Sequence, residues 1–405
     1  MIVASGKILD KVEQVERWLT DLEGRFSLPI YSSVDIRDSG FKSAVVDTNL
    51  FPAGFNNLPL DSHQYTANCF ADAFFQAGIN PGPILLIIEE HTRNKWYLEN
   101  VFVLASMLKK AGYPADIALP GLEQIDQDSL DTAMGNQLKL TPLKRAMENI
   151  QKYQCVLLNN DLSSGIPEFL QTIPLKVLPS PYLGWHSRSK KDHFDTMANL
   201  LTQLAELLDI DPWQLITMTE KVNEVSVHDS VGREYLADKT NTLLTQIQTK
   251  YNEHGIDEKP SVYIKSDQGT YGMAIQVVND ATQVLSFNRK TKNKLNIGKG
   301  NNQVSNFILQ EGIPTHLSVK GSPAEVVLYQ VDKYAVGGFY RVNEQKDNLS
   351  NLNSRGMTFA PIPGHQKSAT ERLSYFHRLL GRIAAVAAAC EIKRVDQPNE
   401  TCFSN

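Results

Sequence analysis

The 405-residue sequence has few cysteines and no long apolar run. Its four cysteines are far apart and include no CxxC pair, so they predict neither a zinc site nor a disulfide framework, and we expect reduced thiols. Apolar segments such as GPILLII fall short of the roughly 18 residues that span a bilayer. The first residues also lack the basic and apolar regions of a signal peptide. We therefore expect a cytoplasmic protein that has no membrane partner.

Positive charge is not concentrated anywhere in the sequence. The net charge is −5 and the lysines and arginines form no block, which argues against a nucleic-acid partner. There is no GxSxG motif, and neither His91 nor His186 stands beside a serine or cysteine nucleophile motif. No hydrolase triad is therefore predicted. The length suggests two or three domains. Small molecules are the expected partners, and a homo-oligomer is compatible with the sequence.

Alternating strands and helices in the first half predict an α/β domain with a parallel sheet. Two short apolar runs, 84–88 and 155–158, are each followed by a polar loop and a helix. The polar clusters 90–94 and 159–164 thus follow strand ends, where parallel sheets bind ligands. Before them, SAVV (43–46) predicts a strand, and a stretch rich in turn-forming residues comes next.

The second half changes character at about residue 260. Residues 193–255 are mostly helical by their apolar spacing, strands broken by glycines follow, and a final helix is predicted over about 370–391. One hairpin, YIKSDQGTYGMAIQVV, places Lys265 ahead of a glycine loop. Such a loop can lay backbone N–H groups along phosphates, and the lysine adds a point charge. An ordinary β-hairpin with a lysine at its edge is the alternative.

The order of these motifs resembles the ATP-grasp superfamily. Lys239 lies upstream of the hairpin, FILQEGIPT lies downstream, and a later hairpin ends at Arg341. In that superfamily two lysines flank ATP, a glycine loop covers its phosphates, a hinge after a strand receives adenine, and an arginine faces the transferred phosphoryl group. The resemblance implies ATP-binding roles for Lys239, Lys265, Gly269, Thr270, Tyr271, Gly272, Gln310, Glu311 and Ile313. It implies catalytic roles for Arg341 and Lys265, through electrostatic stabilisation.

The resemblance also implies Mg²⁺, because ATP phosphates need charge neutralisation. ATP-grasp enzymes usually bind the metal through an acidic residue and a Glu-x-Asn on a last strand, after an alanine-rich helix. Here the helix RIAAVAAACEIKRVD is present, but no Glu-x-Asn follows it. ATP-grasp ligases of the glutathione-synthetase type carry an arginine and then an Asn-Leu-containing stretch, as in GGFYRVNEQKDNLSNLNSRG here. This resemblance implies that Asn351 and Asn353 touch phosphate or the metal ion, with turn formation as the alternative. Glu325 and Asp332 are acidic candidates of second choice.

Polar motifs in the first half predict a pocket for a small, highly polar substrate. Side-chain amides in VDTNLFPAGFNNL suit ammonium and carboxylate groups, and the arginine in EEHTRN can hold a carboxylate. The candidate substrate-binding residues are Asn49, Asn56, Asn57, Glu90, His91, Arg93, Asn94, Asn160 and Arg188. A structural histidine is the alternative for His91, and a surface basic stretch is the alternative for the segment around Arg188.

Four segments together resemble the type III, proteobacterial glutamate–cysteine ligases: KSAVVDTNLFPAGFNNL, EEHTRN, YIKSDQGTYGMAIQVV and VDKYAVGGFYRVN. The likeness runs from about residue 30 to about 365. It implies that ATP phosphorylates the γ-carboxylate of L-glutamate and that the amine of L-cysteine attacks the acyl phosphate, giving γ-glutamylcysteine for glutathione synthesis. The alternatives are another ATP-grasp ligase, such as a glutathione-synthetase-like enzyme, and a non-catalytic nucleotide-binding regulator, against which Arg341 argues.

The resemblance also implies a domain order, with the fold class α/β (α+β). We expect an N-terminal α/β amino-acid-binding domain over residues 1–195, a helical segment plus ATP-grasp lid subdomain over 196–312, and a C-terminal ATP-grasp subdomain over 313–405. Closure of the glycine loop is expected to exclude water, which would otherwise hydrolyse the acyl phosphate.

Overall fold

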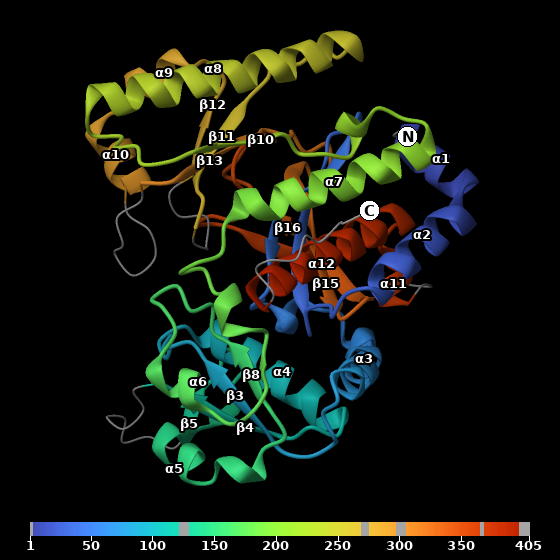
Figure 1. The fold of residues 1–405 in the computed structure, drawn as a ribbon, viewed down its shortest axis with the longest axis vertical. Coiled ribbons are helices and arrows are strands. Elements are labelled where there is room, and N and C mark those ends of the chain that lie inside the picture. Colours follow the sequence, from blue (N-terminus) through green and yellow to red (C-terminus); the bar gives the residue numbers. More distant parts are fainter. Residues whose placement is uncertain (1–2, 121–128, 269–274, 297–304, 365–367, 397–405) are drawn as a thin grey trace.

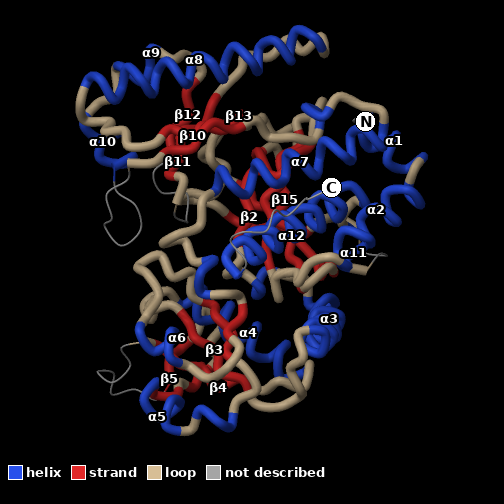
Figure 2. Tube along the Cα trace, in the orientation of Figure 1, coloured by secondary structure: helices blue, strands red, loops and turns tan. Residues whose placement is uncertain are grey.

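The computed structural model describes residues 3–120, 129–268, 275–296, 305–364 and 368–396. Its strands gather in three main sheets that follow one another along the longest axis of the molecule (Figures 1 and 2). A parallel sheet lies at one end, a large antiparallel sheet in the middle and a smaller antiparallel sheet at the other end. The α/β (α+β) class and the parallel sheet of the first half are therefore confirmed.

The parallel sheet has the strand order β7-β4-β3-β8-β9, and every neighbouring pair in it is parallel. Its strands are β3 (Ile84–Ile88), β4 (Ala115–Leu119), β7 (Thr141–Pro142), β8 (Val156–Asn159) and β9 (Val177–Leu178). The helices of this part are α3 (His63–Gln76), α4 (Lys95–Lys110), α5 (Leu143–Glu148) and α6 (Glu168–Thr172), and a separate hairpin joins β5 (Ser129–Asp131) and β6 (Gln137–Lys139). β3 is buried along its whole length, as its apolar run predicts.

The large antiparallel sheet, here called the central sheet, combines the two ends of the chain. Its order is β17-β16-β15-β1-β2, with β14 also paired to β15. The strands are β1 (Ser32–Asp38), β2 (Ser43–Asn49), β14 (Ser318–Val319), β15 (Ser322–Val331), β16 (Tyr334–Val342) and β17 (Thr358–Pro361). The central sheet therefore contains strands from two of the domains expected from the sequence. Residues 1–195 supply β1 and β2, and residues 313–405 supply the other strands.

The two faces of the central sheet differ because side chains alternate along each strand. Val34 and Ile36 on β1, with Val326 and Leu328 on β15, face an apolar layer of helices. That layer contains α1 (Val3–Asp10), α2 (Val12–Gly24), α7 (Lys190–Leu208) and α12 (Tyr375–Asp396), and Figure 1 shows α7 and α12 running across the sheet. The short helix α11 (Ala369–Arg372) precedes α12. The opposite face carries charged residues at one end and apolar residues at the other.

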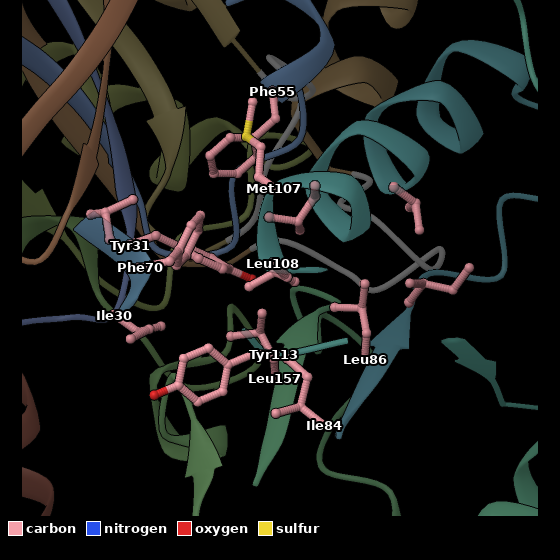
Figure 3. Packing of buried hydrophobic residues seen from close by; sticks show 14 of the residues in the cluster. Ile30, Tyr31, Phe55, Phe70, Ile84, Leu86, Met107, Leu108, Tyr113 and Leu157 are labelled. Carbon is pink, nitrogen blue, oxygen red and sulfur yellow. The ribbon is translucent and has the colours of Figure 1, made fainter. Parts of the chain in front are cut away.

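The apolar end of that opposite face packs against the parallel-sheet part. Tyr31, just before β1, and Phe55 lie in one buried cluster with Phe70 of α3, Leu86 of β3 and Met107 of α4 (Figure 3). Val327, Tyr329 and Phe339 of the central sheet belong to the same cluster. Shared burial of this kind fixes the position of one sheet relative to the other, so residues from both can form one site.

The small antiparallel sheet has the order β10-β13-β11-β12 and is covered by a long helix. Its strands are β10 (Thr219–Val222), β11 (Val262–Ser266), β12 (Ile275–Val278) and β13 (Phe307–Glu311). The helices of this part are α8 (Ser230–Glu253), α9 (Thr282–Leu285) and α10 (Arg289–Asn296). β10 lies within the stretch predicted to be mostly helical and was not predicted. In the described part of the chain, no helix is both long enough and apolar enough to cross a membrane.

Candidate active site

Three adjoining cavities lie along the polar face of the central sheet. The first, of about 50 Å³, lies between the central and small sheets and is lined by Asp35, Arg37, Asp47, Lys265, Gln310 and Asn353, among others. The second, the central cavity, of about 130 Å³, is lined by Asp35, Asp47, Asn49, Trp185, Tyr329 and Arg341, among others. The third, the outer cavity, of about 1170 Å³, is lined by Asn56, Glu90, His91, Arg93, Trp96 and Phe359, among others.

Shared residues place the cavities in a row. Asp35, Asp47 and Asn353 line both the first and the central cavity. Ala53, Asn57, Met357 and Phe359 line both the central and the outer cavity. The first and outer cavities have no lining residue in common among those described. A ligand in the central cavity can therefore touch ligands on both sides.

A buried network of charged side chains lies on paired strands of the central sheet, beside the first and central cavities. Glu325 on β15 lies opposite Arg341 on β16, and one guanidinium nitrogen of Arg341 lies 2.7 Å from Glu325 and 2.6 Å from Asp35. Arg37 donates from Nε to the other oxygen of Glu325 at 2.7 Å. Burial alone would raise the pKa of Glu325, but Arg37 and Arg341 outweigh it and hold that pKa below its usual value.

The neighbouring strand pair brings two more acidic or amide side chains to the same face. Asp35 on β1 lies opposite Asp47 on β2, and Asn49 is two residues further along β2. Burial raises the pKa of Asp35 to about 6 despite its contact with Arg341. Burial also opposes ionisation of Asp47, but Lys190, at 2.8 Å, and Lys265 lower its pKa to about 2.

Lys265 and Gln310 face the central sheet from the small sheet. Lys265 Nζ donates to the side-chain oxygen of Gln310 and to the carbonyl oxygen of Val46. Withdrawal from water lowers the pKa of Lys265 to about 8, although the charge of Asp47 works in the opposite direction. Ile313 also lines the first cavity, so three of the expected ATP-binding residues lie together. Residues 269–272, the expected covering loop, are outside the described residues.

Two expected ATP-binding side chains lie elsewhere. Lys239 is on α8, with Nζ 5.7 Å from the ring centre of Tyr235 on the same helix, and it lines none of the three cavities as described. Glu311 is buried in an ion pair with Lys42 at 3.0 Å and accepts a hydrogen bond from Trp213 Nε1. Its side chain therefore ties β13 to the loop before β2 and is not available to a nucleotide.

Another lysine lies on the same face of the small sheet as Lys265. Lys221 on β10 and Lys265 on β11 both lie opposite Ile308 of the strand between them, so all three side chains share one face of the small sheet. Lys221 Nζ lies 3.3 Å from Asp267, directly before the glycine loop. No pattern in the sequence points to Lys221, because β10 is only a four-residue strand between two long helices.

Most of the expected substrate-binding residues come together. Asn49 and Asn57 line the central cavity, while Asn56, Asn57, Glu90, His91, Arg93 and Asn94 line the outer cavity. Asn94 also caps α4 by accepting a hydrogen bond from the Tyr97 backbone. Asn351 and Asn353 line the first cavity and bond to each other, which shows turn chemistry and a cavity position at once.

Asn160 and Arg188 do not reach these cavities. Asn160 donates to the carbonyl oxygen of Ile88 and fixes the loop after β8. Arg188 is buried in a two-point ion pair with Glu391 of α12, at 2.7 and 3.1 Å, and also donates to the carbonyl oxygen of Thr48. The substrate role expected for Arg188 is replaced by one in joining α12 to β2, because all three of its guanidinium nitrogens are already bonded.

A buried asparagine that was not singled out by sequence positions the loop after β2. The side-chain oxygen of Asn100, on α4, accepts hydrogen bonds from the backbone of Gly54 and Phe55 at 2.7 and 2.9 Å. Its amide donates to Asn159 at 3.2 Å, and Asn159 donates to Pro52 at 2.8 Å. The loop that carries Asn56 and Asn57 is thereby attached to the carboxyl ends of the parallel strands.

A row of cavities lined by paired carboxylates and guanidinium groups is typical of an enzyme that acts on small, highly charged molecules. The sequence model of the glutamate–cysteine ligase family, GshA, matches residues 6–392. The chain therefore belongs to the glutamate–cysteine ligase family, and it is an ATP-dependent ligase that joins glutamate to cysteine.

One solved structure agrees with this assignment. A protein from Methylobacillus flagellatus KT that is assigned as a gamma-glutamylcysteine synthetase is similar over 98% of each chain, with 35% identity and a TM-score of 0.87. D-alanyl-alanine synthetase A from Vibrio cholerae O1 biovar eltor is similar over 75% of this chain and 81% of its own, with 10% identity and a TM-score of 0.33, which is too slight to carry an argument. No functionally curated protein sequence matches the chain.

Proposed function

We propose that ATP binds in the first cavity and that the phosphoryl group is transferred where this cavity joins the central one. The observation that supports this is the position of Lys265 and Gln310 across from Asp35 and Asp47, with Arg341 in the next cavity. A triphosphate needs positive charge on one side and groups that hold a counter-ion on the other. The two sheets supply both sides.

The chemistry needs positioning more than it needs a protein nucleophile. An oxygen of the glutamate γ-carboxylate attacks the γ-phosphorus of ATP, and ADP leaves. The cysteine ammonium group loses one proton to water, and the resulting amine attacks the acyl carbon. Phosphate then leaves, and the nitrogen releases its second proton to water as the amide forms. Lys265 and Lys221 hold phosphate charge, and Gln310 and Ile313 lie beside the nucleotide. Arg341 stabilises the charge that develops during transfer.

We further propose that Mg²⁺ is held by Asp35, Asp47 and Asn49, with Asn353 beside them. Their oxygen atoms suit a hard cation, and the raised pKa of Asp35 shows that burial outweighs the contact of its carboxylate with Arg341, so a further cation beside it would be favourable. Asp47-x-Asn49 also has the spacing of the Glu-x-Asn that no C-terminal strand supplies. The Asp47-x-Asn49 motif lies on β2, the edge strand of the central sheet, which is joined to β15 through β1. The bound ion would neutralise phosphate charge.

The test is ADP release from the purified enzyme with ATP, Mg²⁺ and amino acids supplied singly and in pairs. Glutamate with cysteine should give ADP, and γ-glutamylcysteine with glycine should not, which separates this function from a glutathione-synthetase-like one. Lys265→Ala and Lys221→Ala should raise the KM for ATP about tenfold or more, whereas Lys239→Ala should not change it. Full ADP formation by Arg341→Ala would contradict the catalytic assignment.

Two further expectations belong to this proposal. The described cysteines, Cys69, Cys155 and Cys390, are buried thiols that are not in a disulfide, which fits work in the reducing cytoplasm. A homo-oligomer stays a prediction, which the molar mass in solution will test.

A further inference from the structure

Two side chains in the central cavity have a hydrogen-bond donor without an acceptor. Among the described residues, Trp185 Nε1 and Arg341 Nε make no hydrogen bond. Both residues are buried, with exposed fractions of 3% and 8%, and both line this cavity. Buried donors are almost always paired in folded proteins, so two such donors around one cavity indicate that a ligand supplies the acceptor oxygens.

The indole of Trp185 is held firmly in place. Its backbone N–H donates to Asp161 at 2.9 Å. Lys190 Nζ lies 4.0 Å and the Arg188 guanidinium 4.8 Å from the centre of the indole ring. These contacts are made through the ring and the backbone, so they leave the Nε1–H group without a role in the fold. Lys190 and Arg188 are already paired with Asp47 and Glu391, so it is the Nε1–H group, which can only donate, that selects an acceptor oxygen in the ligand.

The order of the three cavities indicates which substrate carries the acceptor oxygen. The carboxylate that is phosphorylated must lie next to the γ-phosphate, and the central cavity alone adjoins the first cavity among the three. The amine must reach the acyl carbon from the remaining side, where the outer cavity opens. Met357 and Phe359 stand at the boundary of the two cavities and offer an apolar contact for a thiol side chain.

We propose that glutamate binds in the central cavity, with Trp185 Nε1 donating a hydrogen bond to one of its carboxylate oxygens, and that cysteine binds in the outer cavity. Arg93 in the outer cavity is the partner for the cysteine carboxylate. This assignment rests on the proposed function and adds the identity of the ligand in each cavity. It makes Trp185 a specificity residue for the carboxylate substrate.

The first experiment compares steady-state kinetics of three variants. Trp185→Phe keeps the aromatic contacts with Lys190 and Arg188 but removes the donor, and it should raise the KM for glutamate about 10- to 100-fold without changing the KM for cysteine. Arg93→Gln should raise the KM for cysteine and leave that for glutamate unchanged. Trp18→Phe makes the same chemical change in the helical layer and should alter neither value.

The second experiment uses the unaltered enzyme. The sequence has four tryptophans, so a protein labelled with ¹⁵N at the indole nitrogens gives up to four signals. With a non-hydrolysable ATP analogue and Mg²⁺ present, glutamate should shift the Trp185 signal, and cysteine alone should not. A shift with cysteine alone, or a Trp185→Phe enzyme with unchanged glutamate KM, would overturn the assignment. Absence of ADP formation by the unaltered enzyme would instead overturn the proposed function itself.

Discussion

Asp35 and Asp47 lie directly opposite each other on neighbouring strands, and each is compensated by a different cation. Asp35 is bonded to Arg341, and Asp47 is bonded to Lys190. Like charges opposite each other destabilise a sheet unless something neutralises them. This arrangement costs stability in the free enzyme, and a divalent cation would relieve it.

Asp47→Asn should therefore weaken the response to Mg²⁺. Loss of one carboxylate ligand should raise the Mg²⁺ concentration for half-maximal rate at least tenfold, because even outer partners of metal ligands change affinity by about 10- to 100-fold. Asp332→Asn is the matched control, since Asp332 lies at the β15–β16 turn with a φ of 52° that asparagine also tolerates. Equal Mg²⁺ curves for the two variants would remove Asp47 from the metal site.

Lys265 should give the enzyme an alkaline limit. Burial lowers the pKa of Lys265 to about 8, and only its protonated form attracts a triphosphate. As pH rises through about 8, the ammonium group loses its proton, and kcat/KM for ATP should fall, because this parameter reports the free enzyme. Lys265→Arg keeps its charge at every pH in this range and should lose the pH dependence even if its rate is lower. If Lys265→Arg kept the same alkaline decrease in kcat/KM for ATP, that decrease would belong to another titrating group.

Asn100 should act on amino-acid binding through the loop that it holds. Asn100→Leu removes the acceptor for the Gly54 and Phe55 backbone and should raise the KM for an amino-acid substrate more than tenfold, with the KM for ATP unchanged. Asn100→Asp keeps that acceptor and should restore most of the affinity. Equal effects of the two variants on all substrates would indicate a general loss of stability.

Glu391 should be a stability residue and not a substrate residue. Its contacts with Arg188 and His193 outweigh burial and lower its pKa to about 2. A lowered acidic pKa stabilises the fold above the unfolded value of about 4.5, and the stabilisation is lost as pH falls toward 2. Glu391→Gln should cost about 3–5 kcal/mol near pH 7, and the difference from the unaltered protein should shrink between pH 4.5 and 2.

Thermal unfolding across that pH range measures the effect. Glu206→Gln on the exposed side of α7 is the control and should stay within about 0.5 kcal/mol at every pH. A cost for Glu391→Gln that is the same at pH 7 and pH 3 would contradict the ion-pair explanation.

The parallel strands could be predicted because β3 and β8 are continuous apolar runs, whereas β1 was missed although its pattern is clear. Val34 and Ile36 alternate with Asp35 and Arg37, which is the period of a strand with one polar face. The polar face of β1 belongs to the site. The strand therefore carries several charged residues, and its low apolar content hides it from a search for apolar runs. Lys221 could not be predicted, because only strand pairing across Ile308 places it beside Lys265.

The joining of both chain ends in one sheet has a consequence for synthesis on the ribosome. Arg37 and Glu325 touch although 288 positions separate them, and Asp35 and Arg341 are 306 apart. At roughly 5–20 residues per second, the first hairpin waits roughly 15–60 s for the strand that completes it. During that time its backbone edge is open to wrong partners, so we expect newly made chains to depend on chaperones until β15 emerges.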